Sequence, residues 1–404
     1  MALPQGRETG SLETQDWVAA MAIKVLHLID SGGMYGAEAM LLDLVQEQIR
    51  SGLQPVVLSA GTPDDDEKPI ESEARKRGIP VEAFRMKAGF NFARAYQVLG
   101  YAKAQGFDIL HSHGYKFNIL LGMMPAFVRK LPLVTTLHGY VSTGGWSRLM
   151  LYHLVERLVL PHLDGIVLVS GNILKNPVLK GLRAKKTATI HNGIDSAKVR
   201  KGAVDNASVS LQDVFAGDHA ENICLGAIGR LSPEKGFDLL IDVFGRLQSY
   251  EPRLRLVIIG EGELREQLES KIRSMGLEQK IRLPGYINPA YRLISELDGV
   301  VMPSFTEGLP MSLLEACVLH KRIVASDVGS IAEVLDGYLS SAVVKPGDSA
   351  ALERAISELI IDNAGRQVDV GIWDAERFGS VRMAEHYTRF YRDIIGAAGW
   401  QTTN

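Results

Sequence analysis

The strongest constraint on this chain is the regular alternation of short apolar runs with helical patterns along most of its length. Strands that alternate with helices in this way build parallel sheets from βαβ units. We predict strands in the first half at Ile23–Ile29, Pro55–Ser59, Val81–Phe84, Asp108–His111, Leu133–Leu137, Ile166–Val169 and Thr187–Ile190. We predict strands in the second half at Ile223–Ile228, Leu254–Ile259, Ile281–Leu283, Gly299–Met302, Arg322–Ala325 and Ala342–Val344. The pattern therefore predicts the α/β fold class.

The two series of strands indicate two domains, because 404 residues exceed one ordinary core. A polar interval, Asp195 to Asn222, separates them and is the predicted linker. We expect a disordered extension at residues 1–21, Rossmann-like, doubly wound domains at 22–196 and 197–373, and a packing helix at 374–404. Such domains bind ligands at the carboxyl ends of their strands. If those ends face each other, the cleft between the domains is the site.

Charge and composition narrow the class of protein. A net charge of −3 gives no reason to expect a nucleic acid partner. The two cysteines, Cys224 and Cys317, lie in apolar runs, which fits a reduced compartment and no disulfide framework. No apolar run is long enough to cross a bilayer, and the charged first residues lack the apolar core of a signal peptide. We therefore expect a cytoplasmic protein.

The segment SFTEGLPMSLLEACVL, from Ser304 to Leu319, places two carboxylates around a helix start. Glu315 is the only charged residue from Gly308 onwards in this segment, and such a carboxylate is costly unless it is paired or meets a ligand. Glu307 stands just before the turn. The free N–H groups of a helix N-terminus bind anions. The arrangement indicates a nucleotide-sugar pocket; the alternative is a capping acid and a partly exposed helix residue.

A second segment, GRLSPEKG from Gly229 to Gly236, directly follows a predicted strand. Arg230 and Lys235 stand at the mouth of that strand, where two cations can neutralise a diphosphate. A solvated turn explains either residue alone, but it explains the two together less well.

The loop after the first strand, Asp30 to Glu38, is rich in glycine. Glycines such as Gly33 let the backbone approach a ligand, and a helix that begins near Ala37 points its N–H groups at the cleft. The loop is thus a second candidate for the phosphate-binding side.

The rival interpretation of that loop is a dinucleotide fingerprint, with Ser31, Gly33 and Gly36 at its spacing. The fingerprint needs an acidic residue at the end of the second strand, but Ser59–Ala60 stand there. Gly260–Gly262 is a second, weaker match that lacks the third glycine. Nicotinamide binding is therefore disfavoured.

Three histidines end predicted strands of the first half. His138 follows VTTL, while His111 and His113 form an H-x-H pair. Such a pair suggests a metal, but no third ligand stands at a suggestive spacing. A hydrogen-bonding role at the cleft and, for His111, a plain structural role both remain open.

Asp64–Asp66 also form a D-x-D pattern, and the polar stretch around them indicates a solvated loop.

Taken in order, GGMYGAE, TTLHGY, HNGID, GRLSPEKG and SFTEGLPMSLLEA resemble the motifs of the retaining glycosyltransferases of family 4, the glycosyl transferases group 1. GRLSPEKG is similar to the G-R-x-x-x-x-K-G element of that family, and Glu307 with Glu315 is similar to its E-x7-E signature. The resemblance extends from Ile23 to about Tyr391. It implies a GT-B fold, a nucleotide-sugar donor, a hydroxyl acceptor, retention of configuration, no cofactor and no required metal.

The resemblance also implies a role for each motif residue. Arg230 and Lys235 would bind the diphosphate, while Glu307 and His138 would contact the donor sugar; these four are the implied catalytic set. Glu315 would bind the ribose hydroxyls. The implied donor-binding set is Gly33, Gly308, Leu309, Pro310, Ser312, Leu313 and Glu315.

The expected chemistry follows from these parts. Departure of the leaving group builds negative charge on the diphosphate, which Arg230, Lys235 and the helix terminus stabilise in place of a metal. No residue is an obvious covalent nucleophile, since the resemblance assigns the one candidate, Glu307, to sugar binding. A front-face displacement, in which a donor phosphate oxygen takes the acceptor proton, needs no protein base. We therefore expect metal-independent transfer of a hexosyl residue.

The acceptor is expected to be a saccharide or a lipid-linked molecule, because the family includes enzymes of bacterial polysaccharide and glycolipid assembly. The apolar stretch Phe117–Val128, flanked by Lys116, Arg129 and Lys130, has two interpretations. It rests on the inner membrane surface as a peripheral contact, or it forms a buried helix with a basic end.

Two other functions are compatible with the same fold. One is a nucleotide-sugar 2-epimerase, against which the complete GRLSPEKG and E-x7-E pair argues. The other is a non-catalytic protein that binds nucleotide sugars, against which the presence of every motif residue argues.

Overall fold

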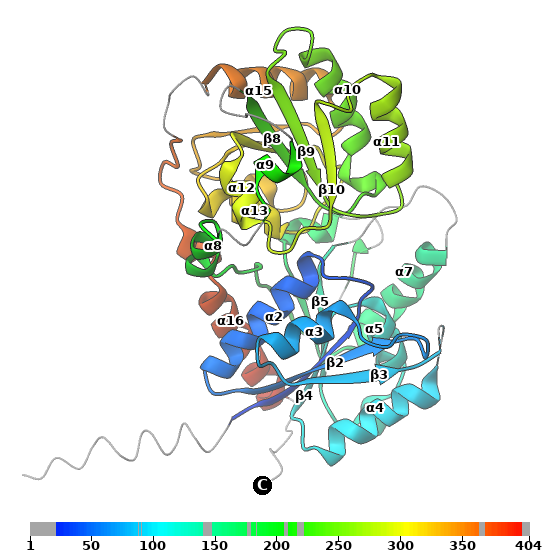
Figure 1. Ribbon diagram of the computed structural model, residues 1–404. Helices are drawn as coiled ribbons and strands as arrows, with labels where there is room; N and C mark the ends of the chain where they lie inside the picture. Colours follow the sequence, from blue (N-terminus) through cyan, green and yellow to red (C-terminus); the bar gives the residue numbers. More distant parts are fainter. Residues whose placement is uncertain are drawn as a thin grey trace, which may run out of the picture.

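The computed structural model describes residues 22–87, 89, 91–139, 148–175, 179–182, 184–205, 209–215, 222–362 and 368–397. These residues form two α/β domains, the first below and the second above in Figure 1. Each domain is a parallel sheet with helices packed around it. The extension predicted at residues 1–21 lies outside the described residues.

The first domain contains a seven-stranded sheet in the order β3-β2-β1-β4-β5-β6-β7, with every pair parallel. Its strands are β1 (Lys24–Asp30), β2 (Gln54–Gly61), β3 (Val81–Arg85), β4 (Ile109–Ser112), β5 (Leu133–Leu137), β6 (Gly165–Leu168) and β7 (Thr187–Thr189). Its helices are α2 (Gly36–Arg50), α3 (Pro69–Lys76), α4 (Phe92–Ala104), α5 (Tyr115–Gly122), α6 (Ala126–Arg129) and α7 (Arg148–Val159).

The second domain contains a six-stranded sheet in the order β10-β9-β8-β11-β12-β13, again parallel throughout. Its strands are β8 (Ile223–Ile228), β9 (Leu254–Ile259), β10 (Ile281–Gly285), β11 (Gly299–Met302), β12 (Arg322–Ser326) and β13 (Ser341–Val344). Its helices are α10 (Phe237–Leu247), α11 (Arg265–Ser274), α12 (Tyr291–Glu296), α13 (Met311–Val318), α14 (Ile331–Val334) and α15 (Ser349–Asp362).

The two sheets confirm the predicted fold class, and all thirteen predicted strands form within the described residues. They form because their apolar residues are covered on both faces: every residue of β5, β6, β11 and β12 is buried. Helix α10 buries one stripe, in which Leu240, Ile241, Phe244 and Leu247 stand at helical spacing, whereas α5 is buried on most of its surface.

Both strand orders reverse direction next to the first strand, between β1 and β4 and between β8 and β11. In doubly wound sheets the crevice at such a switch point binds the ligand. The motif loops that follow β1 and β8 therefore stand where a ligand is expected.

The predicted linker is more structured than its polar sequence suggests. It contains two short helices, α8 (Ser196–Gly202) and α9 (Leu211–Val214), and α8 packs against α12 and α13. A polar sequence can fold in this way because neighbouring helices supply the apolar surface.

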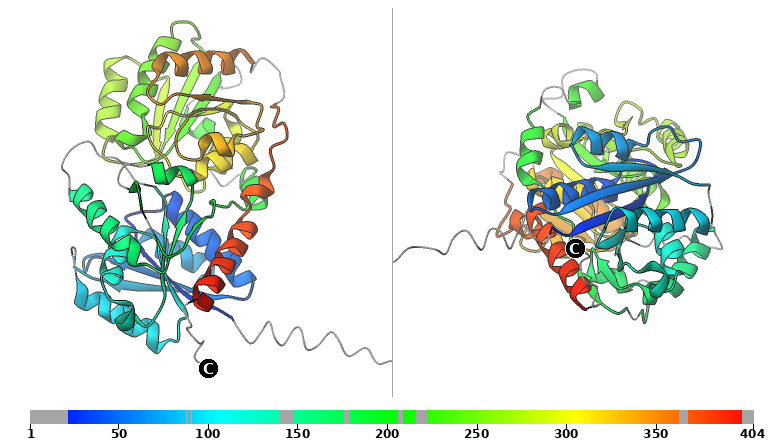
Figure 2. Two further views of the ribbon diagram at one scale, coloured as in Figure 1. Left: turned by 180° about the vertical axis from the view of Figure 1, so that it is seen from behind. Right: turned by 90° about the horizontal axis from the view of Figure 1, so that it is seen from below.

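The chain crosses between the domains a second time before α16 (Ser380–Ala397), which packs on α2 of the first domain and is red in Figure 2. The two crossings touch. Ile194 donates to the Phe378 carbonyl at 2.8 Å, and Ser380 donates to the Ile194 carbonyl at 3.1 Å. A Cβ on Gly193 would lie 2.6 Å from the Gly379 carbonyl oxygen, so the crossing needs glycine there.

The apolar stretch Phe117–Val128 is mostly core. Phe117 and Ile119 to Leu121 are buried in α5, while Met123 and Phe127 are exposed. Arg129 is also buried and donates to Asp164 at 2.9 Å. The interpretation of this whole stretch as a membrane contact is therefore wrong, because its middle packs inside the domain.

Among the described residues, no helix has both the length and the apolar character needed to cross a bilayer.

Candidate active site in the interdomain cleft

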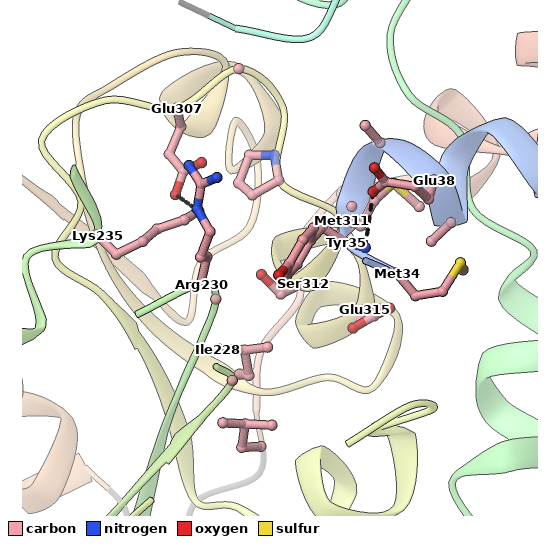
Figure 3. Close-up of a pocket in the computed structure, with 18 of the residues that line it drawn as sticks. Met34, Tyr35, Glu38, Ile228, Arg230, Lys235, Glu307, Met311, Ser312 and Glu315 are labelled. Atoms are coloured by element: carbon pink, nitrogen blue, oxygen red, sulfur yellow. Dashed lines mark hydrogen bonds and ion pairs between the residues drawn. The ribbon is translucent and has the colours of Figure 1, made fainter. Parts of the chain in front are cut away.

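A cavity of about 450 Å³ lies between the two domains and is lined by residues of both. This volume is typical of small-molecule sites. The first domain contributes the start of α2 and the end of β5, and the second contributes the loops after β8, β9, β10 and β11 together with the start of α13. Figure 3 shows this wall, with Met34 and Tyr35 on one side and Arg230 and Lys235 on the other.

The start of α13 borders the cavity with helix N–H groups that no side chain caps. Pro310 precedes the helix with extended backbone. The turn before it needs glycine because the domains touch there. A Cβ on Gly308 would lie 2.0 Å from the carbonyl oxygen of His138 in the first domain.

Glu315 lies one turn into α13 and borders the cavity (Figure 3). Among the described residues, none donates a hydrogen bond to its carboxylate. Burial, with a smaller contribution from the Asp43 charge, raises the pKa of Glu315 to about 7, and Lys198 opposes that shift. A carboxylate that is held unpaired next to a helix N-terminus is suited to accept hydrogen bonds from ligand hydroxyls.

Lys235 is held by the other motif carboxylate. Its Nζ lies 2.6 Å from Glu307 Oε1 (Figure 3). The same carboxylate oxygen also accepts from Ser304 Oγ at 2.7 Å. Lys235 ends a short turn after β8 and is followed by Gly236 at φ +68°. A Cβ on Gly236 would lie 2.3 Å from the Pro303 carbonyl oxygen, so this glycine fixes the loop against the next strand end.

Arg230 is held in a similar way within its own loop. Its guanidinium donates to Glu234 at 2.6 Å, and Ser232 Oγ donates to the same carboxylate oxygen at 2.7 Å. These contacts keep the pKa of Glu234 below its ordinary value although burial opposes them. Both cations of the motif thus face the cavity with acidic partners that an incoming diphosphate can replace.

The first domain meets the second above the start of α2. Tyr35 donates its backbone N–H to Glu38 at 2.9 Å, an arrangement that caps α2. Tyr286, from the loop after β10, donates its hydroxyl to the Met34 carbonyl. Burial raises the pKa of Tyr286 to about 12, so this donor stays protonated at neutral pH.

His138 ends β5 and borders the cavity. Its Nδ1 is buried without a hydrogen-bond partner, and its Nε2 lies 3.4 Å from His113 Nδ1. Burial lowers the pKa of His138 to about 4, so the imidazole is neutral near pH 7.

Most of the motif residues identified in the sequence come together at this cavity. Gly33 does not line it, because the chain turns so that Met34 to Glu38 form the wall instead. Leu313 does not line it either, since its side chain is buried in the core. The sequence-identified residues that do line the cavity are His138, Arg230, Lys235, Glu307, Gly308, Leu309, Pro310, Ser312 and Glu315.

Part of the wall comes from residues outside the sequence motifs. Glu261, Tyr286 and Asn288 line the cavity from the loops after β9 and β10. Gly260, set aside as a poor dinucleotide match, stands at φ +149°, where a Cβ would lie 1.9 Å from the Gly229 carbonyl oxygen. The sequence could have indicated these residues, because the loops after β9 and β10 both follow predicted strands of the second domain.

The H-x-H pair has a third histidine beside it. His27, His111 and His113 offer nitrogen atoms within 4.8 Å of one another, and all three are buried. No local pattern pointed to this third histidine, because His27 lies within β1, far from the pair along the chain. Both ring nitrogens of His27 already have hydrogen-bond partners, as have both of His111.

Comparison with known families agrees with this architecture. Residues 34–198 match the family described as Glycosyltransferase Family 4, and residues 216–370 match the family described as Glycosyl transferases group 1. The chain is 24% identical over 295 residues to the O-antigen biosynthesis glycosyltransferase WclY of Escherichia coli. The aligned region covers 72% of this chain and 80% of that protein.

Two further likenesses bear on the fold and the substrate. Over 181 residues the chain is 29% identical to the N-acetylgalactosamine-N,N'-diacetylbacillosaminyl-diphospho-undecaprenol 4-alpha-N-acetylgalactosaminyltransferase of Campylobacter jejuni, covering 45% of this chain and 46% of that one. The crystal structure of Anabaena Alr3699/HepE in complex with UDP and glucose superimposes with a TM-score of 0.75 at 22% identity, covering 92% of this chain and 99% of that chain.

Two Rossmann-like domains that enclose a cleft at their switch points define the GT-B architecture. The chain belongs to the glycosyltransferases of this fold, with a Family 4 domain followed by a group 1 domain. The resemblance drawn from the motifs is thereby confirmed.

Proposed function

We propose that the protein transfers a hexosyl residue from a nucleotide-diphosphate sugar to a hydroxyl acceptor with retention of configuration. The observation that carries this proposal is the unpaired carboxylate of Glu315 at the start of α13, with Lys235 and Arg230 across the same cavity. The cavity thus offers hydroxyl acceptors, helix N–H groups and two cations to one ligand. A nucleotide sugar presents ribose hydroxyls and a diphosphate in that order.

In the proposed complex the diphosphate displaces the acidic partners of the two cations. Lys235 leaves Glu307 and Arg230 leaves Glu234, which frees Glu307 to accept hydrogen bonds from the donor sugar. As the leaving group departs, these cations and the N–H groups of α13 stabilise the charge that develops on the diphosphate. No metal and no cofactor is needed for that stabilisation.

Retention is proposed through a front-face displacement. The acceptor oxygen forms its bond to the anomeric carbon on the face from which the diphosphate leaves, and a phosphate oxygen takes the acceptor proton. Glu307 is held by Lys235 and Ser304 in the free protein, which suits a sugar-binding carboxylate more than a covalent nucleophile.

UDP-linked hexoses are the first donors to test, because the similar Anabaena fold holds UDP and glucose. The acceptor is proposed to be a saccharide or a lipid-linked molecule, since one relative acts on a diphospho-undecaprenol substrate and another takes part in O-antigen biosynthesis. Leu151, Leu154 and Leu158 form an exposed apolar stripe on α7, 59%, 40% and 72% exposed, which supports a peripheral contact with the cytoplasmic membrane face.

The first experiment is a thermal-shift screen of the purified protein against UDP, GDP, ADP and their common sugar conjugates. Binding to the native state raises the melting temperature with occupancy. The nucleotide that shifts it names the donor class, and transfer is then assayed with that donor, the anomeric configuration of the product being read by NMR. Inverted product or loss of activity in EDTA would contradict the proposed mechanism.

The same assays separate the alternatives. A 2-epimerase would return an isomerised sugar without an acceptor. A binding protein would shift the melting temperature without turnover. For the membrane contact, the paired change Leu154→Glu with Leu158→Glu should abolish co-sedimentation with anionic lipid vesicles, while Ile361→Glu, at an exposed site of the second domain, should not.

A further inference from the structure

A line of hydrogen-bonded side chains leads from the cleft wall into the core of the first domain. His138 Nε2 lies 3.4 Å from His113 Nδ1, and His113 Nε2 lies 3.0 Å from His27 Nδ1. His27 Nε2 in turn lies 2.8 Å from Gln48 Oε1. Three of these residues come from the adjacent strands β1, β4 and β5 or their ends, and the fourth from α2. The line is covered by protein, since His27 and Gln48 are fully buried.

The Gln48 carbonyl fixes the proton on each ring in turn. A carbonyl oxygen only accepts, so His27 carries its proton on Nε2 and accepts at Nδ1. His113 must then donate from Nε2 and accept at Nδ1. His138 must donate from Nε2, which leaves its Nδ1 as a bare acceptor. All three rings are neutral, because burial lowers the pKa of each histidine.

The line continues beyond Gln48. The Gln48 amide nitrogen donates to the Tyr391 hydroxyl at 3.4 Å, and that hydroxyl lies 2.6 Å from His111 Nδ1. His111 Nε2 lies 2.8 Å from Thr136 Oγ1, and Thr136 pairs with Tyr387 at 2.9 Å. Tyr387 and Tyr391 come from α16, so the terminal helix belongs to the same buried network.

If the Gln48 amide were rotated so that its nitrogen faced His27, each hydrogen bond along the three histidines would run in the opposite direction. His138 would then carry its proton on Nδ1, where no acceptor lies within the described residues. Buried donors without a partner are rarer in proteins than buried acceptors without one. The orientation with a bare Nδ1 is therefore favoured.

We propose that Gln48, His27 and His113 are positioning residues that hold the ring of His138, which borders the cleft, in one orientation and in the Nε2–H tautomer. The effect of this fixed ring on a ligand rests on the proposed function, in which the ring lies beside the donor sugar. The tautomer itself does not depend on it. The three residues touch no ligand and act only through His138.

The direct test is the tautomeric state of each histidine, read from ¹⁵N chemical shifts in long-range ¹H–¹⁵N spectra of the ¹⁵N-histidine-labelled full chain. We expect His138, His113 and His27 all as neutral Nε2–H tautomers at pH 7. His138 with its proton on Nδ1, or averaging between tautomers, would overturn the proposal. This result stands whether or not the protein transfers sugar.

A substitution of Gln48 tests whether this residue determines the tautomer of His138. Gln48→Met removes the fixed acceptor, so the His138 signals should move toward a mixture of tautomers although Gln48 lies two histidines away. Thr136→Val perturbs the same buried network beyond Gln48 and should leave the His138 tautomer unchanged. Equal spectra for Gln48→Met and the wild type would refute the proposal, as would one equivalent of Zn²⁺ retained by His27 and His113 in the purified protein.

Kinetics of the same variant distinguish positioning from loss of structure. Gln48→Met should lower kcat/KM for the sugar donor by roughly tenfold, the effect of one weakened hydrogen bond. Its affinity for the nucleoside diphosphate alone should match the wild type, because the proposed function places His138 beside the sugar and not beside the nucleotide. A parallel loss of nucleotide affinity would assign the three residues a structural role instead. If Gln48→Met does not fold, the wild-type spectrum alone decides.

Discussion

At the scale of single residues, Glu315 combines the ligand-binding position that we propose for it with an environment that disfavours its charged form. Its pKa is raised from 4.5 to about 7, which corresponds to roughly 3 kcal/mol against ionisation in the free protein. Two ribose hydroxyls can donate to the ionised carboxylate, whereas the protonated acid accepts less well. Ligand binding and ionisation of this group are therefore coupled.

This coupling predicts a pH-dependent donor affinity. Because the folded pKa of Glu315 is about 7, the carboxylate gains charge as the pH rises from 6 to 8, and the affinity for the nucleoside diphosphate should rise by roughly tenfold. Glu315→Gln should bind weakly and without this pH dependence, and it should melt at a higher temperature than the wild type at pH 8. Titration calorimetry at several pH values measures the effect, and a pH-independent wild type would contradict the ribose role.

At the scale of elements, the loop after β8 and the loop between β11 and α13 act together. Lys235 comes from the first loop and Glu307 from the second, and the two form an ion pair in the free protein. We expect Lys235→Ala to lower kcat by roughly two to three powers of ten, as loss of one preorganised charge does in other active sites. Arg246→Ala, which removes an exposed cation of α10 outside the cavity, is the control and should retain wild-type turnover. Steady-state kinetics with the donor found in the screen decides the matter.

The elements also set the limit of what the sequence could predict. The strands and their loops were predictable because apolar runs and glycine-rich turns are local signals. The direction of Gly33 and the burial of Leu313 were not, since each depends on how a loop or a helix packs after folding. His27 joined His113 only through the parallel pairing of β1 with β4, and no local pattern records such a contact.

The same limit applies to apolar stretches. Phe117–Val128 has the composition of both a surface segment and a core helix, and only its packing in the first domain decided between them. The stripe on α7 was missed because Leu151, Leu154 and Leu158 are spaced as in an ordinary buried face.

At the scale of the whole molecule, the buried histidines make stability depend on pH. Burial lowers the pKa of His27 and His138 to about 4 and holds those of His111 and His113 well below 6.5. The unfolded chain takes up these protons below pH 6.5 and the folded chain does not, so stability falls as the pH drops toward 4. Glu315 has the opposite sign, because its raised pKa favours the folded state between pH 7 and 4.5, but it is one group against four.

The expected result is a melting temperature that decreases by several degrees between pH 6.5 and 4.5. His27→Gln should flatten the dependence, since Gln removes one titrating group. Calorimetry or thermal-shift measurements at constant ionic strength provide the test. A melting temperature that rises over this interval would mean that the histidines are charged in the folded protein.

The two domains touch where Gly308 has no side chain. A methyl group there would lie 2.0 Å from the His138 carbonyl oxygen, a backbone atom that cannot turn aside as a flexible side chain can. Gly308→Ala should therefore keep each domain folded but hold the cleft open, which separates Lys235 and Glu307 from His138. We expect kcat/KM to fall by about a hundredfold or more, since catalysis is sensitive to displacements of an ångström. Gly171→Ala, at a glycine with open space around it, should change neither activity nor shape. Small-angle scattering would detect the opening as an increase in radius of gyration; an unchanged radius with full activity would show that the domains do not need this contact.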